Sequence, residues 1–304
     1  MSSPAASGRG PRQKQANEMR HIHQPGPASP ERTAHVAGVP VPLRFMLEPG
    51  YAVDAALAKG FAASDCLGGF VSLQGGRCEP FRFVMPAAAP DARHAAWYSD
   101  TFAPAGPVAI KRAGAIVGQR DEKLFIHCHG LWDTPEGTQM GHMLAPDTIV
   151  TEPVEVSGIG LRAATFRALP DPETNFTLFE PVQVTEDRGE QAGSRLLLAK
   201  VRPNEDICLA IEDICSRHGI ARANVYGIGS LNEVRFTDGR HVASFATEVL
   251  IQEGRVESAH GRPRASLRID VVDMEGQIFS GDLVHGDNPV CITFELVIEE
   301  IDQL

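Results

Sequence analysis

Apolar and polar residues follow one another along this chain in an order that occurs twice. A strand-like apolar run, a turn that contains proline and a helical segment appear at 43–57 and again at 196–211. In the second segment apolar residues recur every three or four positions, which is the spacing of one helix face. Asn204 is a suitable N-cap for this helix, and Gly219 is a suitable residue to end it. We therefore predict one main helix in each half of the chain.

The rest of each half consists of short strand-like runs separated by turns that contain glycine. The run 66–73 matches 225–231, and the run 136–156 matches 275–297. Within the closing run 290–300, apolar residues recur at every second position, which is typical of a strand. Many strands beside a single helix predict an α+β fold, made of two tandem copies of a mostly antiparallel sheet domain.

Composition divides the chain into four segments. Residues 1–38 are rich in Pro, Gly, Ser, Ala and Gln and lack hydrophobic periodicity, so they predict a disordered basic arm. We expect a first domain at 39–169, a linker at 170–194 and a second domain at 195–304. The first copy is longer than the second, and its Pro/Ala-rich stretch 85–106 is expected to be an inserted loop.

The net charge limits the partners of the predicted domains. The chain of 304 residues has 28 Lys and Arg against 39 Asp and Glu, for a net charge of −11. Residues 1–34 contain five basic and two acidic residues, so they carry +3 and the remainder carries −14. An acidic body repels the phosphate backbone of nucleic acid. DNA contact is therefore expected only through the N-terminal arm or a partner protein.

Cysteine usage and hydropathy indicate a cytoplasmic protein. The six cysteines are scattered and form no C-x-x-C motif, which favours reduced thiols over a disulfide framework. No apolar run approaches the ~18 residues that span a bilayer. The basic residues near the start are not followed by the apolar segment of a secretory signal. We predict no contact with a membrane.

Several motifs taken together resemble one known family. They are GIGSL (227–231), TEVLI (247–251), IHCHGL (126–131), the turn EGTQMGHML (136–144) and closing strands with a central Glu155 or Glu295. This pattern is similar to the plants-and-prokaryotes-conserved (PPC) domain, and it covers about 42–165 and 195–300. The most specific element is the spacing of His127, His129, Gly141 and His142. The chain thus resembles a tandem PPC protein.

The resemblance implies an α+β domain with a curved antiparallel sheet that assembles into trimers, so we expect a homotrimer. It also implies a DNA-binding or transcription-associated role. The interaction segment of plant members, usually Gly-Arg-Phe-Glu-Ile-Leu, survives in part as ATEVLI (246–251) but is AGPVAI (105–110) in the first copy. The two halves therefore retain different parts of the family pattern.

The three histidines form a candidate metal site. Side chains alternate along a strand, so His127 and His129 share one face and Cys128 lies on the other. A turn after this strand allows a neighbouring strand to bring His142 alongside. We predict that His127, His129 and His142 bind a divalent metal ion, preferably zinc, because three neutral imidazoles with an open fourth position are typical of zinc. The alternative is three polar core histidines bonded to one another and to the backbone. Glu155 is expected to orient one imidazole.

The second copy lacks the histidines. Our alignment sets Arg268, Asp270 and Asp282 opposite them, which favours a buried ion pair over a metal site, with a paired-carboxylate acid/base site as the alternative. Two functions remain open at this point. The first is a PPC-class DNA-binding or transcription-associated regulator, with a metal in its first domain. The second is a metal-dependent enzyme that acts on a small molecule through the three histidines. No catalytic residue is assigned.

Overall fold

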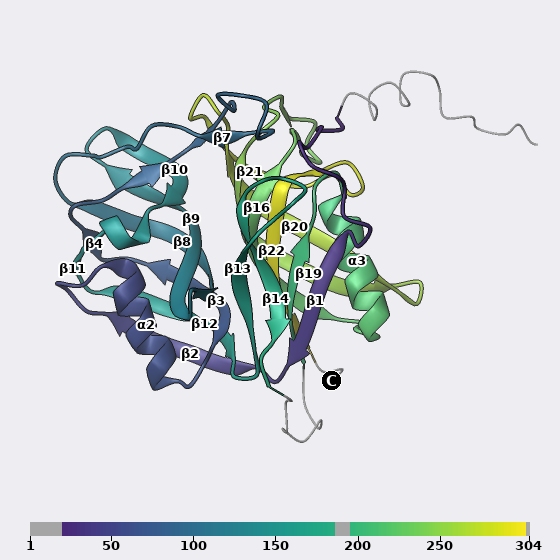
Figure 1. Ribbon diagram of the computed structural model, residues 1–304, viewed down its shortest axis with the longest axis horizontal. Helices are drawn as coiled ribbons and strands as arrows, with labels where there is room; N and C mark the ends of the chain where they lie inside the picture. The colour runs from purple at the N-terminus through teal and green to yellow at the C-terminus, as the bar shows by residue number, and fades with distance from the viewer. Residues whose placement is uncertain (1–19, 186–194, 302–304) are drawn as a thin grey trace, which may run out of the picture.

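Two β-sheets pack face to face, and one helix covers the outer side of each (Figure 1). The computed structural model describes residues 20–185 and 195–301. The layers from one side of the molecule to the other are α2 (Val53–Ala63), the sheet of the first half, the sheet of the second half, and α3 (Ile207–His218). Each half thus has one apolar layer beneath its helix and shares a second apolar layer with the other half.

Both halves have the same strand order. The first sheet contains the order β2-β12-β3-β8-β9-β10 and the second contains β15-β22-β16-β19-β20-β21, with antiparallel neighbours throughout. In chain order, each half therefore runs strand, helix, strand and then four further strands. The last of these returns to lie between the first two strands of its half. The α+β fold with two antiparallel copies is confirmed. The bounds are β2 (Val41–Leu47), β3 (Gly68–Gln74), β8 (Val108–Arg120), β9 (Lys123–Thr134), β10 (Gly137–Met143), β12 (Val154–Leu161), β15 (Leu196–Val201), β16 (Ala223–Leu231), β19 (Glu248–Ala259), β20 (Arg262–Val272), β21 (Ile278–Asp282) and β22 (Val290–Glu300).

Shorter strands and one 3-10 turn accompany the strands of the two sheets. The predicted inserted loop 85–106 contains the small two-stranded sheet β6–β7, which lies above the junction of the two halves in Figure 1. The remaining elements are β4 (Arg77–Cys78), β5 (Phe83–Val84), β6 (Pro86–Ala87), β7 (Trp97–Tyr98), the 3-10 turn η1 (Ala145–Asp147), β11 (Val150–Glu152), β13 (Ala164–Pro170), β14 (Thr177–Gln183), β17 (Val234–Arg235) and β18 (His241–Val242).

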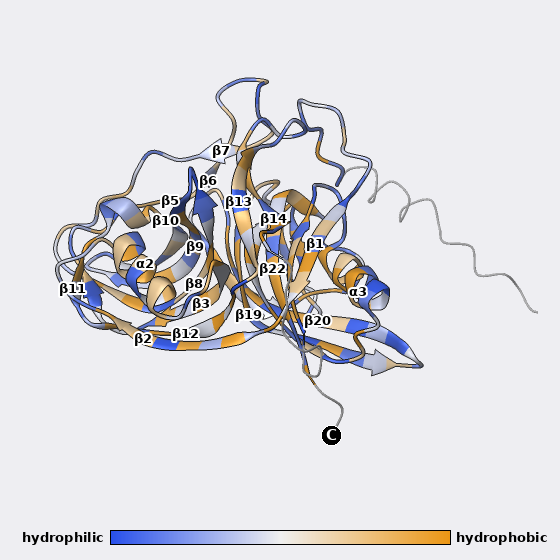
Figure 2. Ribbon diagram, turned by 60° about the horizontal axis from the view of Figure 1, so that its bottom comes forward, coloured by the Kyte–Doolittle hydropathy of each residue, from blue (hydrophilic) through white to orange (hydrophobic). Residues whose placement is uncertain are grey.

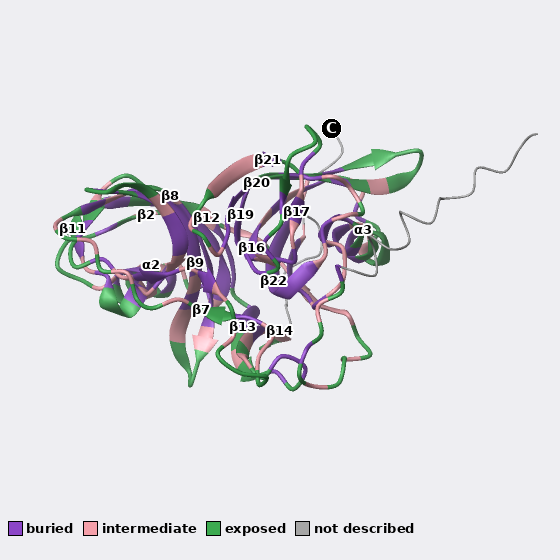
Figure 3. Ribbon diagram, turned by 90° about the horizontal axis from the view of Figure 1, so that it is seen from above, coloured by how far each residue is buried: buried purple, intermediate pink, exposed green. Residues whose placement is uncertain are grey.

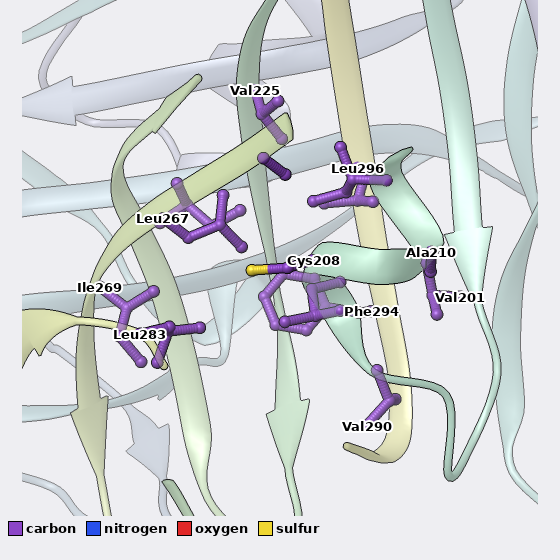
Figure 4. Packing of buried hydrophobic residues seen from close by; sticks show 14 of the residues in the cluster. Val201, Cys208, Ala210, Val225, Leu267, Ile269, Leu283, Val290, Phe294 and Leu296 are labelled. Carbon is purple, nitrogen blue, oxygen red and sulfur yellow. The ribbon is translucent and has the colours of Figure 1, made fainter. Parts of the chain in front are cut away.

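The helix α3 packs on the second sheet as its apolar stripe predicts. Cys208 and Ala210 of the helix contact a core that includes Leu267 and Phe294 of the sheet (Figure 4). Gly219 ends the helix in the left-handed conformation at a φ of 66°, as expected. The N-cap is Asp206 and not Asn204, because the Asp206 carboxylate accepts a hydrogen bond from the Leu209 N–H at 3.0 Å. The side chain of Asn204 instead bonds to the backbone of Ile22.

The apolar layer between the sheets joins the two halves. Phe70 and Ile116 of the first sheet belong to the same buried cluster as Ile228 and Leu250 of the second. A Cβ atom at Gly114 would lie 2.6 Å from the Leu250 side chain, so this glycine permits the close approach of the sheets. Hydrophobic residues gather in the strands of both halves (Figure 2), and buried residues concentrate where the sheets meet (Figure 3). The site described below lies at one end of this layer.

The N-terminal segment crosses from one half to the other. β1 (Thr33–Gly38) precedes the first domain but pairs with β15 at the edge of the second sheet, and Figure 1 shows this purple strand against the green half. Arg32 reinforces the crossing through bonds of 2.8 and 3.0 Å to Glu173. The prediction of a disordered arm over 1–38 is therefore wrong for 20–38, because the open edge of β15 gives this segment a hydrogen-bonding partner. Residues 1–19 lie outside the described residues.

The predicted linker 170–194 is also partly folded. β14 lies within it and pairs with β13. The buried ammonium of Lys200 contacts Asp171 at 3.0 Å and Glu180 at 3.1 Å, which fixes this segment to β15. Burial alone would raise the pKa of Asp171, but Lys200 and Arg202 outweigh burial and lower it to about 2. Residues 186–194 lie outside the described part of the chain.

All six cysteines are free and buried. Among the described residues, no helix has the length and apolar character needed to cross a bilayer.

Candidate metal centre

The three histidines come together at the junction of the two sheets. His127 and His129 project from the same face of β9, whereas Cys128 is buried in the core on the opposite face. His142 lies on β10 directly across from His129 in the strand register. The ring centroids are 4.5 Å apart for the first pair, 4.8 Å for His127 and His142, and 5.5 Å for His129 and His142. Strand alternation thus produces the predicted convergence.

A carboxylate from the second half completes the cluster. Glu248, the first residue of β19, contacts the Nε2 atom of His129. One donor atom from each of Glu248, His127, His129 and His142 lies within 4.8 Å of all the others. Tetrahedral zinc with bonds of about 2.0–2.1 Å needs donor atoms about 3.4 Å apart, so small side-chain movements suffice to enclose an ion. The sequence did not identify Glu248 as a candidate ligand, although it lies in the TEVLI motif. The histidine that it contacts, His129, belongs to the other half of the chain.

Hydrogen bonds orient two of the imidazoles. The Nδ1 atom of His127 lies 2.9 Å from a Glu295 carboxylate oxygen, and Nδ1 of His129 lies 2.9 Å from the Val249 carbonyl. Both partners are acceptors, so each Nδ1 carries the proton and donates it. The two Nε2 atoms then face each other at 2.9 Å. Two lone pairs at this distance repel unless a proton or a metal ion lies between them.

The charges around the cluster favour a cation. Burial lowers the pKa of His127, but Glu295 and Glu248 outweigh burial and raise it. Burial would raise the pKa of Glu295, but His127 and Lys200 outweigh this and lower it. His142 differs, because burial and the two neighbouring imidazoles lower its pKa well below the usual value. The site thus combines buried carboxylates with a neutral imidazole.

His142 also has an unsatisfied atom. Its Nδ1 is buried and has no hydrogen-bond partner among the described residues. An unpaired buried nitrogen is costly, and core histidines that satisfied one another would leave none. The residues present therefore fit a metal ion better than they fit a self-contained polar core.

The role expected for Glu155 is wrong. Glu155 was expected to orient a histidine, but its exposed side chain pairs with Arg44 at 2.7 Å on the outer part of β12. The corresponding role belongs to Glu295 of β22. A Cβ atom at Gly141, beside His142, would lie 2.3 Å from the Val84 carbonyl oxygen. This glycine therefore makes room for β5.

Among the described residues of the second copy, Arg268, Asp270 and Asp282 form no equivalent cluster. Asp282 lies opposite Arg268 in the register, and their ion pair of 3.0 Å is exposed rather than buried. Asp270 lies opposite Ser280 and is fully buried. It accepts two bonds of 2.6 and 2.7 Å from Arg112 of the first half. The strand register thus pairs Arg268 with Asp282 and separates Asp270 from both, so the three residues do not form one group.

A cavity of about 240 Å³ opens beside the histidines. His127, His142, Glu248 and Glu295 line its inner end. Five aromatic side chains form part of its walls, namely Trp97, Tyr98, Phe125, Phe176 and Phe179. Residues from both halves and from the inserted segment 85–106 therefore enclose one space next to the candidate metal centre.

A family model for the Plants and Prokaryotes Conserved (PCC) domain matches residues 188–302. The second half of the chain therefore contains a PCC domain. This confirms the family that the sequence motifs indicated. The matched PCC region holds Glu248 and Glu295, whereas His127, His129 and His142 lie outside it in the first half. The candidate centre therefore joins the PCC region to residues from the other copy of the strand order.

Three solved structures that are similar to this chain each match about half of it or less. A metal-containing protein from Archaeoglobus fulgidus has 16% identity and a TM-score of 0.38, with 49% of this chain and 98% of that chain covered. A plant- and prokaryote-conserved (PPC) protein from Pyrococcus horikoshii has 13% identity and a TM-score of 0.38, with 52% and 99% covered. A "putative DNA binding protein" from Bacteroides thetaiotaomicron has 19% identity and a TM-score of 0.31, with 36% and 79% covered. The comparison with curated proteins found no match to this chain.

Proposed function

We propose that this PCC-domain protein binds one divalent metal ion, preferably zinc, through His127, His129, His142 and Glu248. The observation that carries the proposal is the pair of Nε2 atoms 2.9 Å apart, with both Nδ1 protons committed to acceptors. Imidazole nitrogens with one carboxylate suit zinc and related transition metals, whereas Mg²⁺ and Ca²⁺ prefer sites built from oxygen atoms. When bound, such an ion supplies a Lewis acid at the inner end of the cavity.

Elemental analysis tests the proposal directly. Full-length protein purified without chelators should contain about one transition-metal ion per chain, as expected for a site with four protein ligands. Dialysis against a chelator should remove the ion, and added zinc should restore the same stoichiometry. A metal content far below one ion per chain after zinc is added would show that the histidines are polar core residues.

DNA binding is a second candidate, since one of the structural neighbours carries that description. Residues 1–19 contain three basic residues and one acidic residue, so residues 20–304 carry a net charge of −13. A fragment beginning at residue 20, which retains β1, should bind duplex DNA weakly or not at all at physiological salt. The full chain should lose any weak binding on the changes Arg9→Ala and Arg12→Ala. Tight, salt-sensitive binding by the fragment, measured by fluorescence anisotropy, would contradict this expectation.

We also propose that the chain assembles as a homotrimer, as the family resemblance implies. The monomer mass is 32.8 kDa, and light scattering at micromolar concentration should give about three times this value. A mass that stays at the monomer value would contradict the proposal. Because the candidate centre is completed within one chain, its metal content should not depend on assembly.

A further inference from the structure

The cavity beside the metal centre has the shape of a small-molecule site. It lies between the two halves, and the inserted segment supplies Trp97 and Tyr98 as part of its wall. The rings of Trp97 and Phe176 stack with centroids 5.3 Å apart, and Tyr98 lies against His142 at 5.2 Å. Flat aromatic surfaces of this kind favour a planar aromatic ligand.

The size of the cavity limits the ligand. An apolar cavity of about 150 Å³ accommodates benzene. The cavity of about 240 Å³ therefore has room for one or two rings but not for a nucleotide or a peptide.

The charges that line the cavity exclude an anion. The described lining residues include Glu248 and Glu295 but no lysine or arginine. A divalent ion offsets the two carboxylates and leaves no surplus positive charge for a carboxylate or phosphate group.

Three hydroxyl groups of the wall already make hydrogen bonds. Thr293 donates to Glu295 at 3.0 Å, Thr247 donates to the Leu231 carbonyl at 2.9 Å, and Ser230 accepts from the Ile292 N–H at 3.0 Å. The hydroxyl groups of Tyr98 and Thr177 also line the cavity. A metal ion carries a full charge, so it is a stronger partner than these hydroxyls for a ligand atom with a lone pair.

We propose that this cavity binds an uncharged aromatic molecule of one or two rings, which directs a single oxygen or nitrogen atom to the metal ion. The inference rests on the proposed metal site and adds the class of molecule that the site receives. It places the ligand between the aromatic walls, with its donor atom near His127 and His142.

Three probes that share a fused two-ring aromatic skeleton test the proposal by calorimetry on the zinc-loaded full chain. Isoquinoline has one nitrogen donor and is uncharged when unprotonated, naphthalene has no donor, and 2-naphthoate carries a carboxylate. Isoquinoline should bind about tenfold or more tightly than either of the others, and removal of zinc should abolish this preference. Preference for 2-naphthoate, or equal binding of isoquinoline and naphthalene, would overturn the proposal.

Variants separate this inference from the metal site. Phe176→Ala should weaken isoquinoline about tenfold without changing the zinc content, because Phe176 lines the wall and is not a metal ligand. Tyr51→Ala removes an exposed aromatic side chain outside the cavity and should change neither quantity. Stoichiometric zinc without isoquinoline binding would refute the ligand class and leave the metal site intact. Failure to take up zinc would refute both.

Discussion

Replacing His129 by alanine should remove most of the bound metal from the full chain. Its imidazole is fully buried, and its Nε2 atom lies 2.9 Å from Nε2 of His127 and in contact with Glu248. It is therefore the central member of the four. Changes to groups that only support a metal ligand cost about 10–100-fold in affinity, and loss of a ligand should cost at least as much. Elemental analysis after dialysis against metal-free buffer measures the effect.

Two further variants are needed to interpret this result. One replaces a histidine outside the site, and the other replaces a second metal ligand. His218→Ala removes a histidine from the last turn of α3, where it contacts His35 at 2.9 Å, and should leave the metal content unchanged. Glu248→Gln keeps the volume of the side chain and should also lower the metal content, which separates ligand loss from misfolding. Full metal retention in folded His129→Ala protein would show that these residues do not form the site.

Arg112→Ala should destabilise the folded chain by about 3 kcal/mol. The Asp270 carboxylate is fully buried and accepts two bonds from Arg112 across the junction of the halves. After the change, this carboxylate would retain only the uncharged donors Gln252 and Ser280. A buried charge without an opposite charge is strongly unfavourable. The free energy of unfolding in urea measures the loss.

A surface pair provides the comparison for Arg112. Arg255 contacts Glu253 at 3.1 Å, but both side chains are more than half exposed. Arg255→Ala should therefore change the free energy of unfolding by less than about 1 kcal/mol. Equal losses in the two variants would mean that Asp270 does not depend on Arg112 for its charge compensation.

Local patterns predicted the parts of the site that depend on a single strand or hairpin. His127 and His129 share a face because strand side chains alternate, and the turn that follows carries His142 back to them. Glu248 and Glu295 could not be assigned in the same way. Their position depends on how the two sheets pack, and alternation within one strand contains no information about the partner sheet.

The fold was predictable to a similar extent. The helical stripe and the repeated strand runs predicted the two copies, whereas residues 33–38 lack a strand pattern strong enough to be recognised. They form β1 because the edge of β15 offers backbone partners, which is a tertiary effect that overrides local preference. Asn204 does not cap the helix for a related reason, because its side chain forms hydrogen bonds with the backbone of Ile22.

The crossing of β1 has a consequence for the order of folding. During synthesis, the segment from Thr33 to Gly38 emerges well before β15, which supplies all of its ladder partners. This strand therefore remains unpaired until the whole first half and the first strand of the second half have been made. Pairing between residues so distant in sequence slows folding and ties its last step to both halves. The chain is thus expected to fold as one cooperative unit, although it contains two copies of the same strand order.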